Sequence, residues 1–378
     1  MIFASDNWAG ASEKVMAALA EQAKRGGPAY GDDLLTKLVE RRFAEIFERK
    51  VAVFFVATGT AANALSLAAY SQPGAVAFCH REAHVIADEP GSAELFGGVR
   101  LIGLPGEAGK IATETLERAL ARFPEGNAHH GRPVAITLSE LTELGAAYTP
   151  AEIGALTAVA KRRGLRVHMD GARFASAVAG LDVSPADLTW RAGVDILSFG
   201  GTKNGCLSAE AVIFFEPADA NGFALARQRA GHTFSKSWFV AAQLDAYLDH
   251  GHWLDLAGGA NATARRLADA IATSPEARLV REPDGNEVFV ILSKALDHRL
   301  RAAGAVYHPW SVESLAEEER PAADEVLIRL IASFSTAGED VDRFAAVVSG
   351  TRNRKSVIRN QRSSRRTALR RRLLITDI

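Results

Sequence analysis

The sequence predicts an α/β fold, in which a mostly parallel sheet is flanked by helices and is followed by a smaller α+β domain. Two observations predict it. Short apolar segments alternate with helical stretches over the first 220 or so residues, which is typical of strands joined by crossover helices. The chain also has 378 residues, 48% of them hydrophobic, a length that fits roughly two or three domains with a cleft between them.

Seven segments have the length and apolar character of buried strands. They are Val51–Ala57, Ala75–Cys79, Val99–Leu101, Val134–Leu138, Leu165–Asp170, Val194–Phe199 and Ala211–Phe215. Between several of them lie helical stretches such as Glu152–Arg163, where apolar residues recur at helical spacing behind Thr149-Pro150. Ligands of such sheets bind at the carboxyl ends of the strands, so functional residues are expected just after each segment.

A long helical region from about Ser235 to Ala272 is followed by two shorter strand-like segments, Glu287–Leu292 and Val326–Ala332. We therefore expect residues 1–254 to form an N-terminal segment and a large domain, with residues 255–350 as a small C-terminal domain.

Residues 351–378 carry ten Lys or Arg against one Asp and lack a sustained apolar period. We expect a disordered basic appendage there. An arm that binds RNA or a membrane surface is the alternative reading.

The overall charge is balanced, with 44 basic and 45 acidic side chains, which excludes a chain-wide nucleic-acid surface. Cys79 and Cys206 follow no metal-ligand spacing, so we expect no metal site, and buried free thiols are favoured over a disulfide. The start has no signal-peptide pattern. The uncharged run 51–70 is interrupted by Thr58-Gly59-Thr60 and Asn63, which favours a strand and a helix over a membrane span. These observations predict a cytoplasmic protein without membrane partners.

The strongest local signal for chemistry is the segment 198–205, Ser-Phe-Gly-Gly-Thr-Lys-Asn-Gly, directly after a predicted strand. Its glycines would let the backbone approach a ligand closely. Lys203 would point into the pocket, where burial and a nearby cation lower its pKa and make it a Schiff-base nucleophile. A surface lysine is the structural alternative. Lys236 is the only other one of the ten lysines in a plausible context.

A second signal is the segment 168–173, His-Met-Asp-Gly-Ala-Arg, which closes another apolar strand. The buried carboxylate of Asp170 needs a cation or a hydrogen-bond donor. Arg173 stands at the mouth, where it could bind a carboxylate through two hydrogen bonds. A plain Asp–Arg ion pair is the alternative.

Thr58-Gly59-Thr60 lies between a predicted strand and a helix, where backbone N–H groups can bind a phosphate. The segment matches neither the ATP-binding nor the dinucleotide-binding pattern, and an ordinary helix cap is the alternative. His84 follows the next strand. A phosphate site, an amine nucleophile, a buried carboxylate and a carboxylate-binding arginine together meet the needs of pyridoxal 5'-phosphate.

From about Phe3 to Val348 the chain resembles the threonine aldolases of the low-specificity L-threonine type, within the aspartate-aminotransferase-like fold type I group of pyridoxal-phosphate enzymes. The motifs that carry the resemblance are Ser5-Asp6-Asn7, Tyr30-Gly31-Asp32, residues 59–63, Glu82-Ala83-His84, residues 168–173, residues 201–205, residues 227–232 and Ile328-Arg329-Leu330.

The resemblance implies a role for each cofactor residue. Lys203 would bond to the cofactor's aldehyde, and Asp170 would pair with the pyridine nitrogen. His84 would stack on the ring near the substrate hydroxyl. Gly59 and Thr60 would contact the phosphate.

The resemblance also implies that Ser5, Arg173 and Arg329 hold the substrate carboxylate. Arg173 and Arg229 are among the implied cofactor contacts, with Arg229 at the phosphate. One position departs from the family pattern, because Glu143 stands where many members carry a histidine. The base at the substrate hydroxyl is therefore His84, Glu143 or a water.

The activity that the resemblance implies is that of an aldehyde-lyase, which cleaves L-threonine, L-allo-threonine and other β-hydroxy-α-amino acids to glycine and an aldehyde. A β-eliminating lyase or an aminotransferase would use the same residues, and a non-catalytic relative is a further alternative. The resemblance implies a homodimer or homotetramer with active sites at the subunit interface. No nucleic-acid partner is expected apart from the basic tail.

Overall fold

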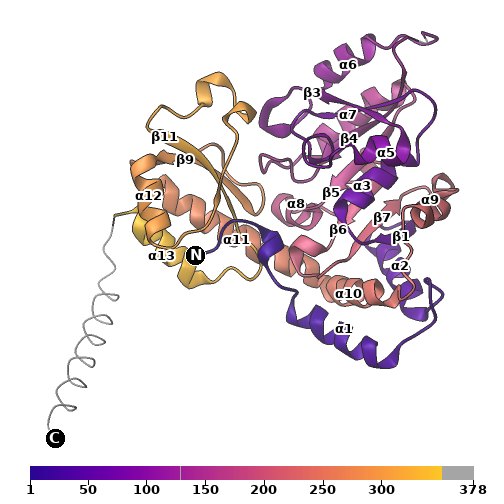
Figure 1. Ribbon diagram of the computed structural model, residues 1–378, viewed down its shortest axis with the longest axis horizontal. Helices are drawn as coiled ribbons and strands as arrows, with labels where there is room; N and C mark the ends of the chain where they lie inside the picture. The colour runs from indigo at the N-terminus through magenta and orange to yellow at the C-terminus, as the bar shows by residue number, and fades with distance from the viewer. Residues whose placement is uncertain (128, 351–378) are drawn as a thin grey trace, which may run out of the picture.

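The computed structural model describes residues 1–127 and 129–350, which form two sheets, each with its own hydrophobic core (Figure 1). The expectation for residues 351–378 lies outside the described residues.

The larger sheet has seven strands in the order β1-β7-β6-β5-β4-β2-β3. They are β1 (Ala52–Val56), β2 (Ala75–His80), β3 (Arg100–Leu104), β4 (Arg132–Ser139), β5 (Arg166–Gly171), β6 (Ile196–Gly200) and β7 (Glu210–Phe214). Only β7 runs against its neighbours. The predicted fold class, a mostly parallel seven-stranded sheet flanked by helices with a smaller α+β part, is confirmed.

Helices cover both faces of this sheet. They are α1 (Glu13–Arg25), α2 (Leu34–Ile46), α3 (Gly59–Ala68), α4 (His84–Ala87), α5 (Ser92–Gly97), α6 (Thr113–Ala121), α7 (Pro150–Arg162), α8 (Phe174–Leu181), α9 (Phe223–Arg229) and α10 (Trp238–Leu248). Neighbouring strand residues point to opposite faces. Ile196 accordingly packs with α3 and α9, whereas Leu197 packs in the main core on the other face.

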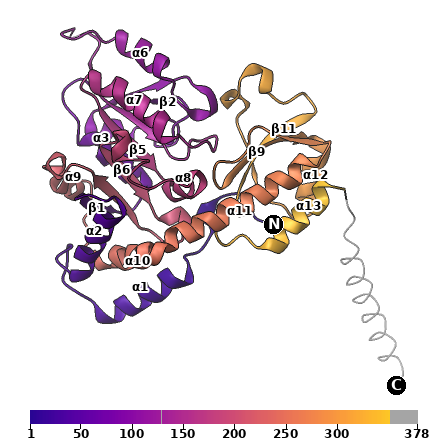
Figure 2. The ribbon, with the colours of Figure 1, turned by 180° about the vertical axis from the view of Figure 1, so that it is seen from behind.

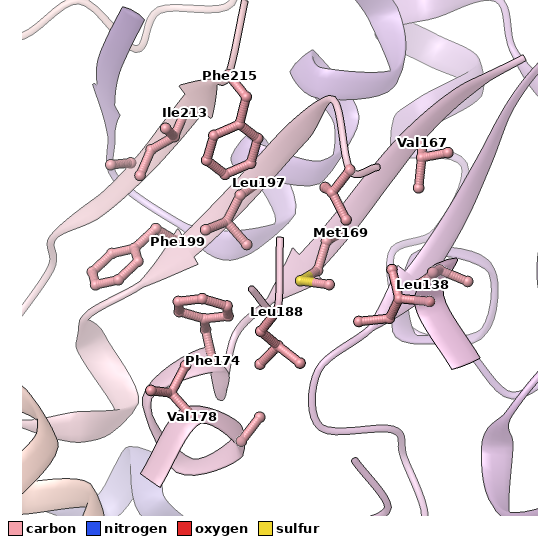
Figure 3. Close-up of a cluster of buried hydrophobic side chains, with 14 of the residues drawn as sticks. Leu138, Val167, Met169, Phe174, Val178, Leu188, Leu197, Phe199, Ile213 and Phe215 are labelled. Atoms are coloured by element: carbon pink, nitrogen blue, oxygen red, sulfur yellow. The ribbon is translucent and has the colours of Figure 1, made fainter. Parts of the chain in front are cut away.

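The main core lies between the sheet and helices α2, α7, α8 and α10. Figure 3 shows its centre, where Leu197 and Phe199 of β6 lie beside Met169 of β5 and Phe174 of α8. The Phe199 ring packs edge-on against Phe174, with ring centroids 6.0 Å apart. This packing fixes the end of β6 from which the turn with Lys203 departs.

The second sheet is antiparallel, in the order β10-β11-β9-β8. Its elements are β8 (Ala277–Leu279), β9 (Glu287–Ser293), β10 (His308–Pro309), β11 (Glu325–Ile331), α12 (Lys294–Ala302) and α13 (Gly338–Val348). Helix α11 (His252–Ala272) runs from the large sheet to the second one, as Figure 2 shows from behind. Met1 and Phe3 also pack into this second core, where the Phe3 ring lies edge-on to Phe344 of α13. The boundary near residue 255 stays a prediction.

The helical region expected from Ser235 to Ala272 is broken in the structure. Helix α10 ends at Leu248, and α11 begins at His252. Between them, His250 and Gly251 have positive φ angles of 51° and 74°, which a right-handed helix excludes. Cys79 and Cys206 are buried and unpaired, as expected. None of the helices described is both long and apolar enough to cross a membrane.

The packing of Phe199 gives a stability prediction. Phe199→Ala is expected to lower the free energy of unfolding by about 3–5 kcal/mol, because the ring is fully buried and its loss leaves a cavity. Denaturant unfolding followed by fluorescence measures the change. Leu95→Ala is the matched control: Leu95 is 79% exposed, so its change is expected within about 0.5 kcal/mol. Equal effects of the two variants would contradict the prediction.

Candidate active site

The predicted site residues meet at one edge of the large sheet. Because β7 is antiparallel to both β1 and β6, strand β1 runs in the same direction as the five parallel strands, and their carboxyl ends share this edge. Gly59 and Thr60 follow β1, His84 follows β2, Asp170 lies in β5 and Lys203 follows β6. The edge is the expected place for a ligand in such a sheet.

Lys203 lies in a short 3-10 turn, Thr202–Asn204, just beyond β6. The buried Glu210 of β7 fixes this turn, since its carboxylate accepts a hydrogen bond from the Thr202 backbone N–H at 3.2 Å. Burial and the neighbouring guanidinium of Arg173 lower the pKa of Lys203. A lowered pKa favours the neutral amine, which is the nucleophilic form.

The glycines before Lys203 allow close backbone packing around the turn. A Cβ at Gly200 would lie 2.7 Å from the Ala172 carbonyl oxygen, and one at Gly201 would lie 2.6 Å from that of Ala209. Neither distance is possible for a real side chain. These glycines therefore let two neighbouring backbone segments approach the turn, and Gly200 also lines a small pocket together with Lys203. Their expected role in the approach of a ligand stays a prediction.

Asp170 is a buried carboxylate with a hydrogen-bond donor for each oxygen. Oδ1 accepts from the Ala172 backbone N–H at 3.0 Å, and Oδ2 accepts from the Asn63 side-chain amide at 2.8 Å. His168, on the same face of β5, is fully buried and contacts the Ser198 hydroxyl at 2.9 Å. Burial lowers the pKa of His168 to about 4, so this histidine is neutral at pH 7.

Asn63 and Glu89 join Asp170 to His84. The Asn63 amide also donates to Glu89 Oε1 at 2.8 Å, and that oxygen lies 2.8 Å from His84 Nδ1. The hydrogen bond to Glu89 raises the pKa of His84. With Nδ1 held by a buried carboxylate, Nε2 of His84 remains for contact with a ligand.

Glu143, at the position that departs from the expected pattern, is half-buried beside His84. Its Oε1 accepts hydrogen bonds from the His84 backbone N–H at 2.7 Å and from the Ser139 hydroxyl at 3.1 Å. Its Oε2 is buried and has no partner among the described residues. Burial raises the pKa of Glu143 to about 7.

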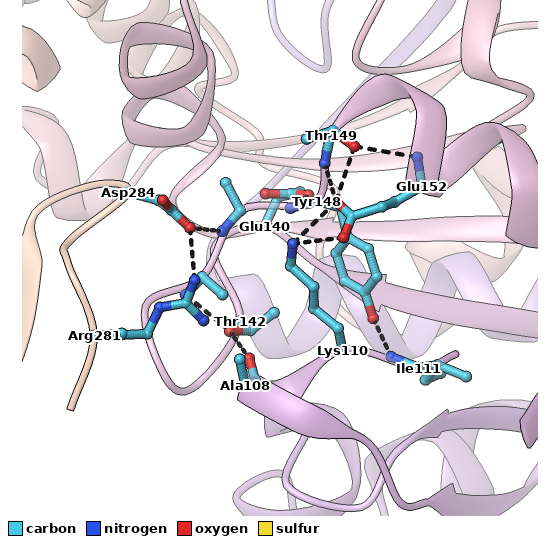
Figure 4. A network of polar contacts seen from close by, with 12 residues as sticks. Ala108, Lys110, Ile111, Glu140, Thr142, Tyr148, Thr149, Glu152, Arg281 and Asp284 are labelled. Atoms are coloured by element: carbon cyan, nitrogen blue, oxygen red, sulfur yellow. Dashed lines mark hydrogen bonds and ion pairs between the residues drawn. The ribbon is translucent and has the colours of Figure 1, made fainter. Parts of the chain in front are cut away.

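The loop that carries Glu143 is anchored on both sides (Figure 4). Glu140, fully buried, accepts a hydrogen bond from the Tyr148 backbone N–H at 2.8 Å. The Ala147 N–H donates to Asp284 at 3.0 Å, and Arg281 donates to the same carboxylate oxygen at 3.1 Å. These two residues precede β9, so the loop is also tied to the second sheet.

Arg173 and Arg329 lie on either side of a shared acidic residue, Glu287. Arg173 donates from Nε and Nη2 to the two carboxylate oxygens of Asp6, at 2.9 and 3.2 Å. Glu287 of β9 lies between the arginines, 3.5 Å from Arg173 and 3.7 Å from Arg329. The Arg329 guanidinium stacks 4.0 Å above the Trp310 ring.

Ser5 precedes Asp6, and its hydroxyl caps the turn Asp6–Trp8 by accepting the Asn7 N–H at 3.1 Å. Ser5 is therefore held near Arg173 through Asp6. Arg229, at the end of α9, is exposed. Among the described residues, no hydrogen bond or ion pair joins it to the other candidates, so its expected contact stays a prediction.

The start of α3 fits a phosphate group. Gly59 and Thr60 are its first two residues, and the first N–H groups of a helix have no partner within it. A Cβ at Gly59 would meet nothing within 4 Å, so the space beside the helix start is open. This anion site, the Lys203 amine and the Asp170 carboxylate are the donor and acceptor set that a phosphorylated pyridine aldehyde needs.

Five polar residues of the site went unrecognised in the sequence: Asp6, Asn63, Glu89, Glu210 and Glu287. Asp6 and Asn63 belong to motifs quoted above, but their partners lie far along the chain. Glu210 and Glu287 stand at the start of apolar strands. A charged residue at the start of an apolar strand could have indicated a site residue, because a buried carboxylate needs a partner.

Comparisons with known proteins identify the family of the chain. A family model described as beta-eliminating lyase matches residues 3–295. The low specificity L-threonine aldolase of Pseudomonas aeruginosa is 41% identical over 80% of this chain and 87% of its own length. That of another Pseudomonas strain is 39% identical over the same shares. The solved structure of the Leishmania major threonine aldolase superposes with a TM-score of 0.85 at 24% identity, covering 92% of this chain and 98% of the other.

The family match covers most of the chain, and the first of these relatives exceeds 40% identity over most of both proteins. The chain therefore belongs to the beta-eliminating lyase family, alongside the low specificity L-threonine aldolases.

Proposed function

We propose that this protein is a pyridoxal-phosphate-dependent aldehyde-lyase that cleaves the Cα–Cβ bond of β-hydroxy-α-amino acids. L-threonine or L-allo-threonine would give glycine and acetaldehyde. The observation that carries the proposal is the meeting of Lys203, Asp170 and His84 at one sheet edge, in a chain 41% identical to a low specificity L-threonine aldolase.

Bound pyridoxal phosphate would supply an electron sink for the pair left by the broken Cα–Cβ bond. Lys203 would hold the aldehyde end, because its lowered pKa favours the reactive neutral amine. Asp170, whose two oxygens are both oriented by donors, would pair with the ring nitrogen. Gly59 and Thr60 would hold the phosphate at the start of α3.

The substrate carboxylate binds between Arg173 and Arg329, with Ser5 beside them. Two guanidinium groups, one at the start of α8 and one on β11, fix the direction of the carboxylate, and a fixed carboxylate sets the orientation of the Cα–Cβ bond. Arg229 completes the phosphate site from a second subunit in this proposal.

His84 is the base that takes the proton of the β-hydroxyl. Its Nδ1 is held by Glu89, which leaves Nε2 as the acceptor and makes it more basic. Glu143 is less suited to this step, because its free Oε2 is buried and its Oε1 is engaged by the His84 backbone. Glu143 instead fixes the position of His84.

A homo-oligomer in the cytoplasm is the third part of the proposal. Exposed apolar side chains on the surface, such as Tyr30 at 64% and Leu34 at 82%, support an association between subunits. Two buried unpaired cysteines support a reducing compartment.

The role of Lys203 can be tested by substitution. Lys203→Ala is expected to abolish both aldehyde formation and the visible absorbance of the covalently held cofactor. Glycine, acetaldehyde and the cofactor spectrum would be recorded with each threonine diastereomer. Lys236→Ala is the control and should retain the absorbance. Keto acid and ammonia in place of aldehyde would instead identify a β-eliminating lyase, and an unchanged spectrum in Lys203→Ala would refute the assignment.

The Glu89–His84 pair predicts a shift in the pH profile. The raised pKa of His84 means that activity, which needs the neutral imidazole, is lost as pH falls through that value. Glu89→Gln removes the charge that raises the pKa, so the acid limb of the kcat/KM profile is expected to move to lower pH. Asp170 and Lys203 also face His84 and remain unchanged.

The exposed Glu94→Gln is the matched control for that profile, since it removes the same charge from the neighbouring helix α5. Its acid limb should coincide with that of the wild type. An acid limb that stays in place in Glu89→Gln would exclude His84 as the titrating base.

A further inference from the structure

Glu287 is a buried acid at the place where the substrate carboxylate is expected. Its side chain has no exposed surface, and its two carboxylate oxygens approach Arg173 at 3.5 Å and Arg329 at 3.7 Å. Neither oxygen has a hydrogen-bond partner among the described residues. Burying a carboxylate without hydrogen bonds is unfavourable, so its position between these arginines needs a reason.

The need to neutralise Arg173 does not explain the buried position of Glu287. Asp6 already contacts Arg173 through two hydrogen bonds, at 2.9 and 3.2 Å. Asn286 fixes Asp6 in turn, donating to Oδ2 at 3.1 Å. With Glu287 added, two acids face two arginines, and the cluster is neutral before any ligand arrives.

Glu287 is also held in place. A Cβ at Gly145 would lie 3.2 Å from Cβ of Glu287, so the loop after β4 packs directly against it. The residue lies in β9, paired with Ile331 of β11. This packing opposes a swing of the carboxylate away from the arginines, and an arriving ligand therefore meets the charge of Glu287 in place.

We propose that Glu287 acts as an internal carboxylate, which shares Arg173 and Arg329 with the carboxylate of a bound amino acid and weakens its binding. The inference rests on one part of the proposed function, namely that these arginines hold the carboxylate of the bound amino acid. It makes Glu287 a residue that sets affinity for substrate and product without touching the bond that is cleaved.

Weaker carboxylate binding benefits a lyase of this kind. Threonine and glycine carry the same carboxylate, so tight binding of this group would increase the affinity for substrate and product equally. Uniform binding of this sort lowers KM without raising kcat. When the charges of the two arginines are balanced by Asp6 and Glu287, the arginines can still orient the carboxylate, and glycine can still dissociate.

The test compares ligands with and without a carboxylate. Calorimetry on the cofactor-loaded enzyme would give dissociation constants for glycine and for glycinamide. In Glu287→Gln, glycine is expected to bind on the order of tenfold more tightly, because one repelling charge is removed in a partly screened site. Glycinamide should bind as in the wild type. KM for threonine should fall by a similar factor, with no rise in kcat.

Two further variants complete the test. Glu282→Gln removes an exposed charge from the segment before β9 and should leave both constants unchanged. Glu287→Asp keeps the charge but shortens the side chain, so its glycine affinity should lie between those of the wild type and Glu287→Gln. It also keeps the proposal testable if Glu287→Gln does not fold.

Glycine binding that is unchanged or weaker in a folded Glu287 variant would overturn the proposal. An equal gain for glycinamide would overturn it as well, because the effect would then not depend on the carboxylate. Glycine binding requires no cleavage. Failure of the wild type to form aldehyde would therefore count against the proposed function alone.

Discussion

The two hydrogen bonds donated by the Asn63 amide hold the candidate site together. One reaches Asp170 at the end of β5, and the other reaches Glu89, which contacts His84 beyond β2. Three segments of the sheet edge are thereby fixed relative to one another by a single side chain from α3. Because both acids are buried, loss of the amide would leave Asp170 Oδ2 without its donor and would remove one of the partners of Glu89 Oε1, which is costly at low dielectric.

The surroundings of Lys203 and His84 set the pKa of each side chain. Lys203 is half-buried near Arg173, and desolvation together with this guanidinium lowers the pKa of its amine. His84 has the opposite environment, since its hydrogen bond to Glu89 raises its pKa. A nucleophile that is readily neutral and a base that is readily protonated thus lie at the same edge. Desolvation is the main cause of the first pKa shift, and the hydrogen bond to Glu89 is the main cause of the second.

Much of the fold could be predicted from the sequence, because its signals are local. Each of the seven apolar segments became a strand, and Lys203, Asp170 and His84 could be found because each follows or ends one of them. The strand order could not be predicted, since the placement of β7 between β1 and β6 depends on pairings between residues such as Phe54 and Val212. The packing of Phe3 against Phe344 also joins residues that are far apart in the sequence.

The acids of the site were missed for the same reason. Glu287 contacts Arg173 only because the start of β9 in the second sheet lies beside the start of α8, and no local pattern reports that contact. Charged residues at the ends of apolar strands are nevertheless informative, because burial requires a partner for each of them. In this protein the partners are the arginines expected to hold the substrate. The acids that stabilise these arginines in the free enzyme must therefore also limit how tightly a ligand carboxylate can bind, so stability and affinity are set by the same contacts.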